Sequence, residues 1–306
     1  MKSIVDVCAV AALALTAGVA LPASSALAAD LSAVKAALPP PGAAGPLWNG
    51  FYAGLNAGYA FDGGAPVAFV STPVFSNPLL TPDGVSLRDA ATLGGAGVLR
   101  RAADGFIGGG QIGYNRQYGA VVFGLEADIQ GLAFAQASRS GVTSLPTTLP
   151  GQNWVTATSA SKSTDYLGTV RGRVGIVVKP TLMVYGMGGL AYGGVSSRIG
   201  IVGADTPGVT AAASGGSFSD TLVGWSAGGG VEWAVCRHWS VKAEYLHYDL
   251  GHAHYSAGAR APAAAGDILW SHASAAATRF DGHIARVGVN YHIDVAAAQP
   301  ALASRF

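Results

Sequence analysis

Two carboxylic acids stand two residues apart in the apolar segment GLEADIQG, at Glu126 and Asp128. Carboxylates at this spacing could act as a general acid and base, or could pair with basic groups. Only 11% of the 306 residues are charged, so two acids inside an apolar run need a specific explanation. The chemistry open to them depends on the element that carries them and on the side chains that face them.

The segment alternates with a period of two, which is typical of a β-strand. Its apolar side chains would project from one face, and the two acids with Gln130 from the other. Eight segments of the chain alternate in this way and are predicted strands: residues 50–61, 105–118, 120–134, 165–178, 182–194, 222–235, 239–251 and 283–293.

The connections between these strands differ in length. Three are short turns, near residue 119, at 179–181 and at 237–238. Four are long and rich in Ala, Ser, Thr, Gly and Pro: residues 62–104, 136–164, 195–221 and 252–282. This pattern predicts an all-β fold, an eight-stranded antiparallel up-and-down transmembrane β-barrel with short periplasmic turns and long extracellular loops. We expect the loops to be exposed and flexible, with short strand extensions above the membrane.

The first 29 residues have the pattern of a secretory signal peptide. Lys2 precedes an apolar run at 7–21, and Pro22 ends this run before the small residues of a cleavage motif at 26–28. An N-terminal membrane anchor, the alternative, would need a longer run. After residue 29, no run reaches the roughly 18 apolar residues of a membrane helix. Export without such a helix favours a β-barrel of the outer membrane.

The rest of the chain is predicted to have three parts. Residues 30–47 are an Ala/Pro-rich periplasmic linker, residues 48–293 form the barrel, and residues 294–306 are a C-terminal tail. The net charge of +1, with scattered basic residues, argues against a nucleic-acid partner. Cys8 lies in the signal peptide, so Cys236 is left alone and is expected to be a buried, unreactive thiol.

The inner faces of the predicted strands carry as many bases as acids. An eight-stranded barrel has an interior just wide enough for side chains to fill, and an unpaired charge there is costly. We therefore expect a structural network of ion pairs that packs the barrel interior, and no catalysis. Its members are Glu126, Asp128, Arg171, Arg173, Glu232, Lys242, Glu244 and Arg286.

Aromatic residues near the strand ends predict two girdles that flank an apolar band. The periplasmic girdle would contain Trp48, Phe51, Tyr114, Tyr185, Trp233, Trp239 and Tyr291. The outer girdle would contain Tyr59, Phe61, Tyr166, Tyr192, Trp225 and Tyr245.

With these segments in order, the chain resembles the small outer-membrane β-barrel family with an OmpA-like transmembrane domain, in particular the outer-membrane immunogenic proteins. The resemblance rests on segments such as WNGFYAGLNAGYAF, VFGLEADIQG, GWSAGGGVEW and RVGVNY, and covers nearly all of residues 48–293. It implies an integral outer-membrane protein with no cofactor and no catalytic residues. The implied partners are outer-membrane lipids including lipopolysaccharide, the barrel-insertion machinery, and a host or cell-surface ligand at the loops. In this chain a tail follows the last strand, which departs from the family's usual aromatic end.

Several functions remain open at this point. The first is a structural and surface-interaction barrel, and the second is a narrow porin that passes small polar solutes. The third is haem or metal capture at the last outer loop, where five histidines gather: His247, His252, His254, His272 and His283. A lipid-modifying enzyme, the fourth, would need a nucleophile beside His247, and no serine is placed there by the sequence.

Overall fold

A computed structural model describes residues 47–100, 104–134, 138–206, 208–260, 263–264 and 267–293. The predicted signal peptide, nearly all of the predicted linker and the predicted C-terminal tail lie outside these ranges. The barrel itself therefore accounts for almost everything that can be described.

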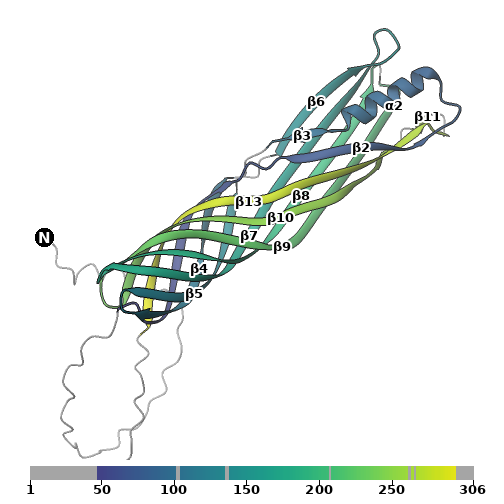
Figure 1. The fold of residues 1–306 in the computed structure, drawn as a ribbon. Helices are drawn as coiled ribbons and strands as arrows, with labels where there is room; N and C mark the ends of the chain where they lie inside the picture. Colours follow the sequence, from purple (N-terminus) through teal and green to yellow (C-terminus); the bar gives the residue numbers. More distant parts are fainter. Residues whose placement is uncertain are drawn as a thin grey trace, which may run out of the picture.

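Eight antiparallel strands form a closed ring, so the predicted barrel is confirmed (Figure 1). The ring closes because β1 pairs with β13 as well as with β4. The three predicted short turns connect β4 to β5, β7 to β8 and β9 to β10. In order around the ring, the strands are β1 (Gly50–Asp62), β4 (Gly105–Tyr118), β5 (Val121–Phe134), β7 (Asn153–Lys179), β8 (Leu182–Asp205), β9 (Ala211–Ala234), β10 (Trp239–Arg260) and β13 (Trp270–Ile293).

The half of the barrel next to the short turns, which we call the lower storey, ends where β1, β4 and β5 end. Its outward positions are apolar and exposed, as at Leu125 (65%), Val170 (49%) and Trp233 (56%). Its inward positions are polar and buried, as at Glu126 and Thr169. An apolar outer band around a polar interior is the pattern of a barrel wall in contact with lipid.

Beyond this level five strands continue outward and form a second half, the upper storey. Here the expectation of flexible loops with short extensions is wrong, because β7, β8, β9, β10 and β13 are 22 to 27 residues long. Further elements complete the upper storey: β2 (Val67–Ser76), α2 (Pro82–Gly94), β3 (Gly97–Leu99), β6 (Ser138–Pro146), β11 (Ala263–Ala264) and β12 (Asp267–Ile268). β2 extends the sheet from β13, and β6 pairs with β7.

The wall of the upper storey differs in composition from that of the lower storey. In the upper storey the inward side chains include large apolar residues such as Trp154, Ile199 and Ile201, all at most 1% exposed, together with polar ones such as Thr156 and Ser197. Many outward side chains are polar, as at Ser159 and Arg198, although Val202 is apolar and exposed. Polar outward side chains are typical of a wall in water, so we place the boundary of the hydrocarbon where the outward apolar band of the lower storey ends.

Helix α2 covers the far end of the upper storey (Figure 1). Its N-terminus is capped by Thr81, whose hydroxyl oxygen accepts a hydrogen bond from the Gly84 amide at 3.3 Å. Leu87 and Ala91 of the helix pack in one apolar cluster with Trp154 and Trp270. In the described part of the chain, no helix is long and apolar enough to cross a membrane.

Candidate functional site in the barrel interior

The eight predicted interior charges all lie in the lower storey and point into the barrel. Each of them is at most 5% exposed. The register places opposite charges side by side on neighbouring strands: Glu126 faces Arg171, Lys242 faces Glu232, and Glu244 faces Arg286. Strand pairing alone therefore places opposite charges next to each other, without any contact across the barrel.

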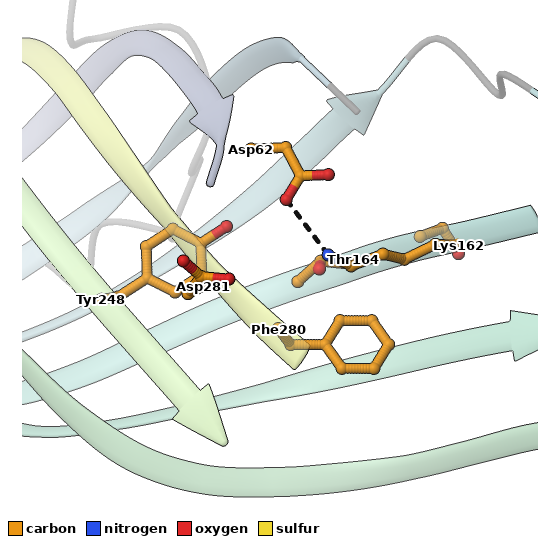
Figure 2. A pocket seen from close by; sticks show the side chains of 7 residues that line it. Asp62, Lys162, Thr164, Tyr248, Phe280 and Asp281 are labelled. Atoms are coloured by element: carbon orange, nitrogen blue, oxygen red, sulfur yellow. Dashed lines mark hydrogen bonds and ion pairs between the residues drawn. The ribbon is translucent and has the colours of Figure 1, made fainter. Parts of the chain in front are cut away.

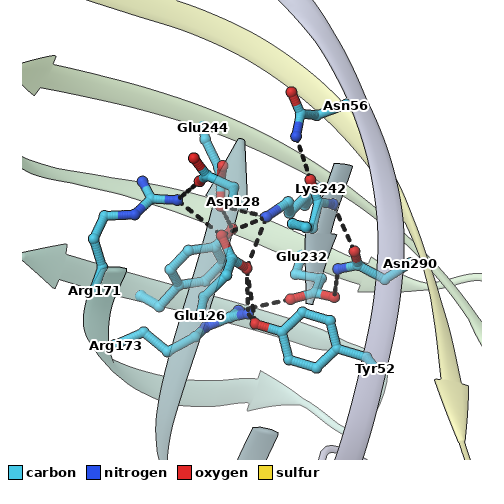
Figure 3. Close-up of polar contacts among 12 residues, drawn as sticks. Tyr52, Asn56, Glu126, Asp128, Arg171, Arg173, Glu232, Lys242, Glu244 and Asn290 are labelled. Carbon is cyan, nitrogen blue, oxygen red and sulfur yellow. Dashed lines mark hydrogen bonds and ion pairs between the residues drawn. The ribbon is translucent and has the colours of Figure 1, made fainter. Parts of the chain in front are cut away.

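Glu126 is the centre of this network (Figure 3). Its carboxylate accepts from Arg171 Nη2 at 2.9 Å and from Lys242 Nζ at 2.9 and 3.0 Å. Arg286 and Arg173 lie farther away, at 3.5 and 3.6 Å. One carboxylate thus lies within 4 Å of all four basic groups, whose positive charge it partly neutralises.

Each of the four bases joins at least two acids. Arg286 donates from Nε to Glu244 at 2.6 Å and from Nη2 to Asp128 at 2.9 Å. Lys242 lies 2.9 Å from Glu244 in addition to its contacts with Glu126, and Arg171 also pairs with Asp128. Because each base contacts at least two acids, the interior forms a single connected network.

Glu232 forms the periplasmic end of the network. It receives a hydrogen bond from Arg173 Nη2 at 2.6 Å, from the Ser240 hydroxyl at 2.6 Å and from Asn290 Nδ2 at 2.8 Å. The Arg173 guanidinium also lies 3.9 Å from the centroid of the Tyr185 ring, a cation–π contact. These groups satisfy a carboxylate that is fully buried.

Two tyrosines belong to the network, and for one of them the predicted place in the periplasmic girdle is wrong. Tyr52 donates to Glu126 and Tyr185 donates to Glu244, both at 2.7 Å. Tyr185 was expected in the periplasmic girdle together with Trp48, but the two are only 4% and 1% exposed. The alternation of β8 places Tyr185 opposite in direction to the exposed Val184, so the sequence did contain the signal.

One part of the network contains the residue types of a hydrolytic triad. Ser240 Oγ lies 2.9 Å from His292 Nε2, and Glu232 lies 3.6 Å from the same nitrogen. A triad uses both ring nitrogens, one for the nucleophile and one for the acid. Ser240 also donates its own proton to Glu232 and is fully buried. This arrangement satisfies Glu232 and does not activate Ser240.

Apolar layers close the interior on both sides of the charges. Toward the short turns the interior is filled by Trp48, Val122 and Met183, all at most 1% exposed. On the outward side lies an apolar layer formed by Ile107, Leu167, Leu246 and Ile284, again at most 4% exposed. These four side chains belong to one buried apolar cluster.

A small cavity lies above the apolar layer, where the two storeys meet (Figure 2). Its volume of about 10 Å³ is room for about one water molecule. Lys162 Nζ lies 3.1 Å from Asp62 and 5.0 Å from the centroid of the Phe280 ring. The cavity is therefore a local gap beside a buried ion pair.

The five outer histidines do not form one cluster. His247 and His283 are neighbours on the outer face, with ring centroids 4.7 Å apart. His252 and His254 form a second outer pair, whereas His272 is buried and lies 2.7 Å from the Thr92 hydroxyl. In the described ranges, no three His, Cys, Asp or Glu side chains are grouped so that they could hold a metal ion. Cys236 is a partly buried thiol outside any disulfide.

Comparisons with protein families, with known proteins and with solved structures each found matches. Residues 11–292 match the family described as outer membrane protein beta-barrel domain. The 31 kDa outer-membrane immunogenic protein of Brucella melitensis is 35% identical over 235 residues, which cover 75% of this chain and 82% of that protein. The 22 kDa outer membrane protein of Rhizobium leguminosarum is 32% identical over 182 residues, or 54% and 69% of the two chains. Among solved structures, the outer membrane protein OprG of Pseudomonas aeruginosa matches with 7% identity and a TM-score of 0.35, covering 80% of this chain and 97% of that one.

Proposed function

Because the chain belongs to the outer membrane protein β-barrel family, we propose that it is a closed, non-conducting and non-catalytic barrel that acts through the surface it presents outside the cell. The lower storey anchors this surface in the outer membrane. The interior charges have a structural role in this proposal. Its partners are outer-membrane lipids including lipopolysaccharide, the barrel-insertion machinery during assembly, and a host or cell-surface ligand.

The observation that carries the proposal is the succession of buried layers of side chains along the barrel interior. Charged side chains fill the middle of the lower storey, and the apolar layer around Leu167 and Leu246 lies above them. A pore for small polar solutes would need water or polar groups along its whole length. The narrow-porin alternative would therefore require several buried layers to move apart.

A second support is the surface of the upper storey. Exposed apolar side chains occur at its outer connections, with Leu79 88% and Val209 76% exposed. Strands and a helix hold these positions well outside the lipid-facing band, where another molecule can reach them. The ordered upper storey thus suits a role in surface contacts.

The closed interior is tested by recordings of single-channel conductance in planar bilayers. We expect the purified protein to give no steady openings under conditions in which a 16-stranded porin gives clear ones. Steady openings whose number rises with the amount of this protein would contradict the proposal and favour the narrow porin.

The orientation of the surface is tested by cysteine labelling on intact cells. In a C236S background, Leu79→Cys places a thiol in the upper storey, and Lys179→Cys places one at the end of β7, next to a short turn. We expect a membrane-impermeant maleimide to label Leu79→Cys on intact cells, and Lys179→Cys only after the outer membrane is permeabilised. The reverse result would invert the topology and end the proposed role.

A further inference from the structure

The outer face of β10 carries two imidazoles one strand repeat apart, at His252 and His254. Between and after them, Ala253 is 2% exposed and Tyr255 turns inward, where its hydroxyl lies 2.8 Å from Ser197 Oγ. Since neighbouring side chains of a strand point to opposite faces, the two histidines must point outward. Both are exposed.

The backbone holds this pair in a fixed arrangement. The segment pairs regularly with β13, with His252 opposite Arg279 and His254 opposite Ala277. The two rings are nearly parallel, at 19°, and their centroids are 6.3 Å apart. Among the described residues, no side chain or backbone group forms a hydrogen bond with either ring, so the nitrogens are open to a ligand.

We propose that His252 and His254 together bind one divalent transition-metal ion, of the class of Zn²⁺, Ni²⁺ or Cu²⁺, at the cell surface. Imidazole nitrogen is a preferred ligand of these ions, at about 2.0–2.1 Å, and is a poor ligand for Ca²⁺ and Mg²⁺. Two nitrogens bound to one tetrahedral ion lie about 3.3 Å apart. Rotation of the two exposed side chains about their own bonds would turn one nitrogen of each ring toward a shared ion.

The neighbouring charges permit a cation at this place. Arg279 lies opposite His252 and would repel a metal ion if it stood alone. Its guanidinium instead pairs with Asp249, with Nε 3.2 Å from Oδ1, so that the pair carries no net charge. Ala277, opposite His254, leaves room for water molecules that complete the coordination of the ion.

Two protein ligands are fewer than the four of a structural zinc site or the three of a catalytic one. The pair is therefore suited to reversible capture of a metal ion from the medium. This inference goes beyond the proposed function, since it assigns a ligand to one face of the upper storey. It holds whether or not the barrel conducts.

Isothermal titration calorimetry of the tag-free protein in detergent micelles tests the site, with ZnCl₂ and NiCl₂ as probes. We expect one ion per chain for the wild type. In His252→Ala or His254→Ala, binding should weaken by at least about tenfold, because a single imidazole is left to hold the ion. Both side chains are exposed, so the fold should survive, as measured by heat-modifiable migration on gels. CaCl₂ and MgCl₂ should give no binding isotherm.

His247→Ala is the matched control, because it removes an imidazole from the other outer pair, with His283. Its affinity for Zn²⁺ should equal that of the wild type. If His247→Ala loses the binding, or if His252→Ala and His254→Ala retain it, the assignment is wrong. Wild-type protein that binds none of the probe ions also overturns it.

Discussion

Replacing Glu126 with alanine is expected to lower the free energy of unfolding by about 3–5 kcal/mol, which is the usual effect of breaking a buried ion pair from one side. The variant leaves the four basic groups around Arg171 and Lys242 facing three acids. Their side chains are at most 2% exposed, so water cannot solvate the excess charge. The measurement is the urea midpoint of unfolding in detergent micelles or lipid vesicles, followed by tryptophan fluorescence.

Two further variants separate charge from packing. Glu126→Gln keeps the shape and one acceptor but removes the charge, so it should also be strongly destabilised. Adding Lys242→Met to Glu126→Gln restores equal numbers of acids and bases and should recover part of the loss. The control is Asp89→Ala on α2, where the carboxylate is 57% exposed and its pair with Arg88 is worth about 0–1 kcal/mol. Glu126→Ala as stable as Asp89→Ala would mean that the interior charges do not depend on one another.

The interior charges could be predicted from the sequence because apolar and polar residues alternate clearly along the strands of the lower storey. In segments such as GLEADIQG, large apolar residues alternate with ionisable ones. Since every second residue points to the same face of a strand, the alternation shows which face each residue occupies. The partners of each charge could not be predicted in the same way. They depend on the register between strands, which places Glu126 opposite Arg171 and brings Lys242 across the interior.

The strands of the upper storey could not be predicted because polar and apolar residues do not alternate clearly along them. In residues 154–164, threonines on the inward face alternate with serines on the outward face, so both faces carry small polar side chains and polarity does not separate them. Helix α2 had a local signal in Thr81-Pro82-Asp83, a cap followed by proline and an acid in the first turn. It lies within a connection whose composition favoured a loop, and the docking surface that stabilises it comes from strands far away in the sequence.

The two storeys differ in solvent, and this difference can be measured at single positions. We expect Leu125→Arg in the lower storey to lower the free energy of unfolding in lipid vesicles by about 2–4 kcal/mol, because the arginine faces the hydrocarbon. The matched control is Val202→Arg in the upper storey, an outward apolar residue that is 56% exposed against 65% for Leu125. There the arginine faces water, so its effect should stay within about 0.5 kcal/mol. Both residues project outward from paired strands and are similarly exposed. A difference between the effects of the two substitutions therefore cannot come from exposure or from position in a strand. Equal effects of the two substitutions would mean that the same solvent surrounds both storeys, and the placement of the membrane on the lower storey would then be wrong.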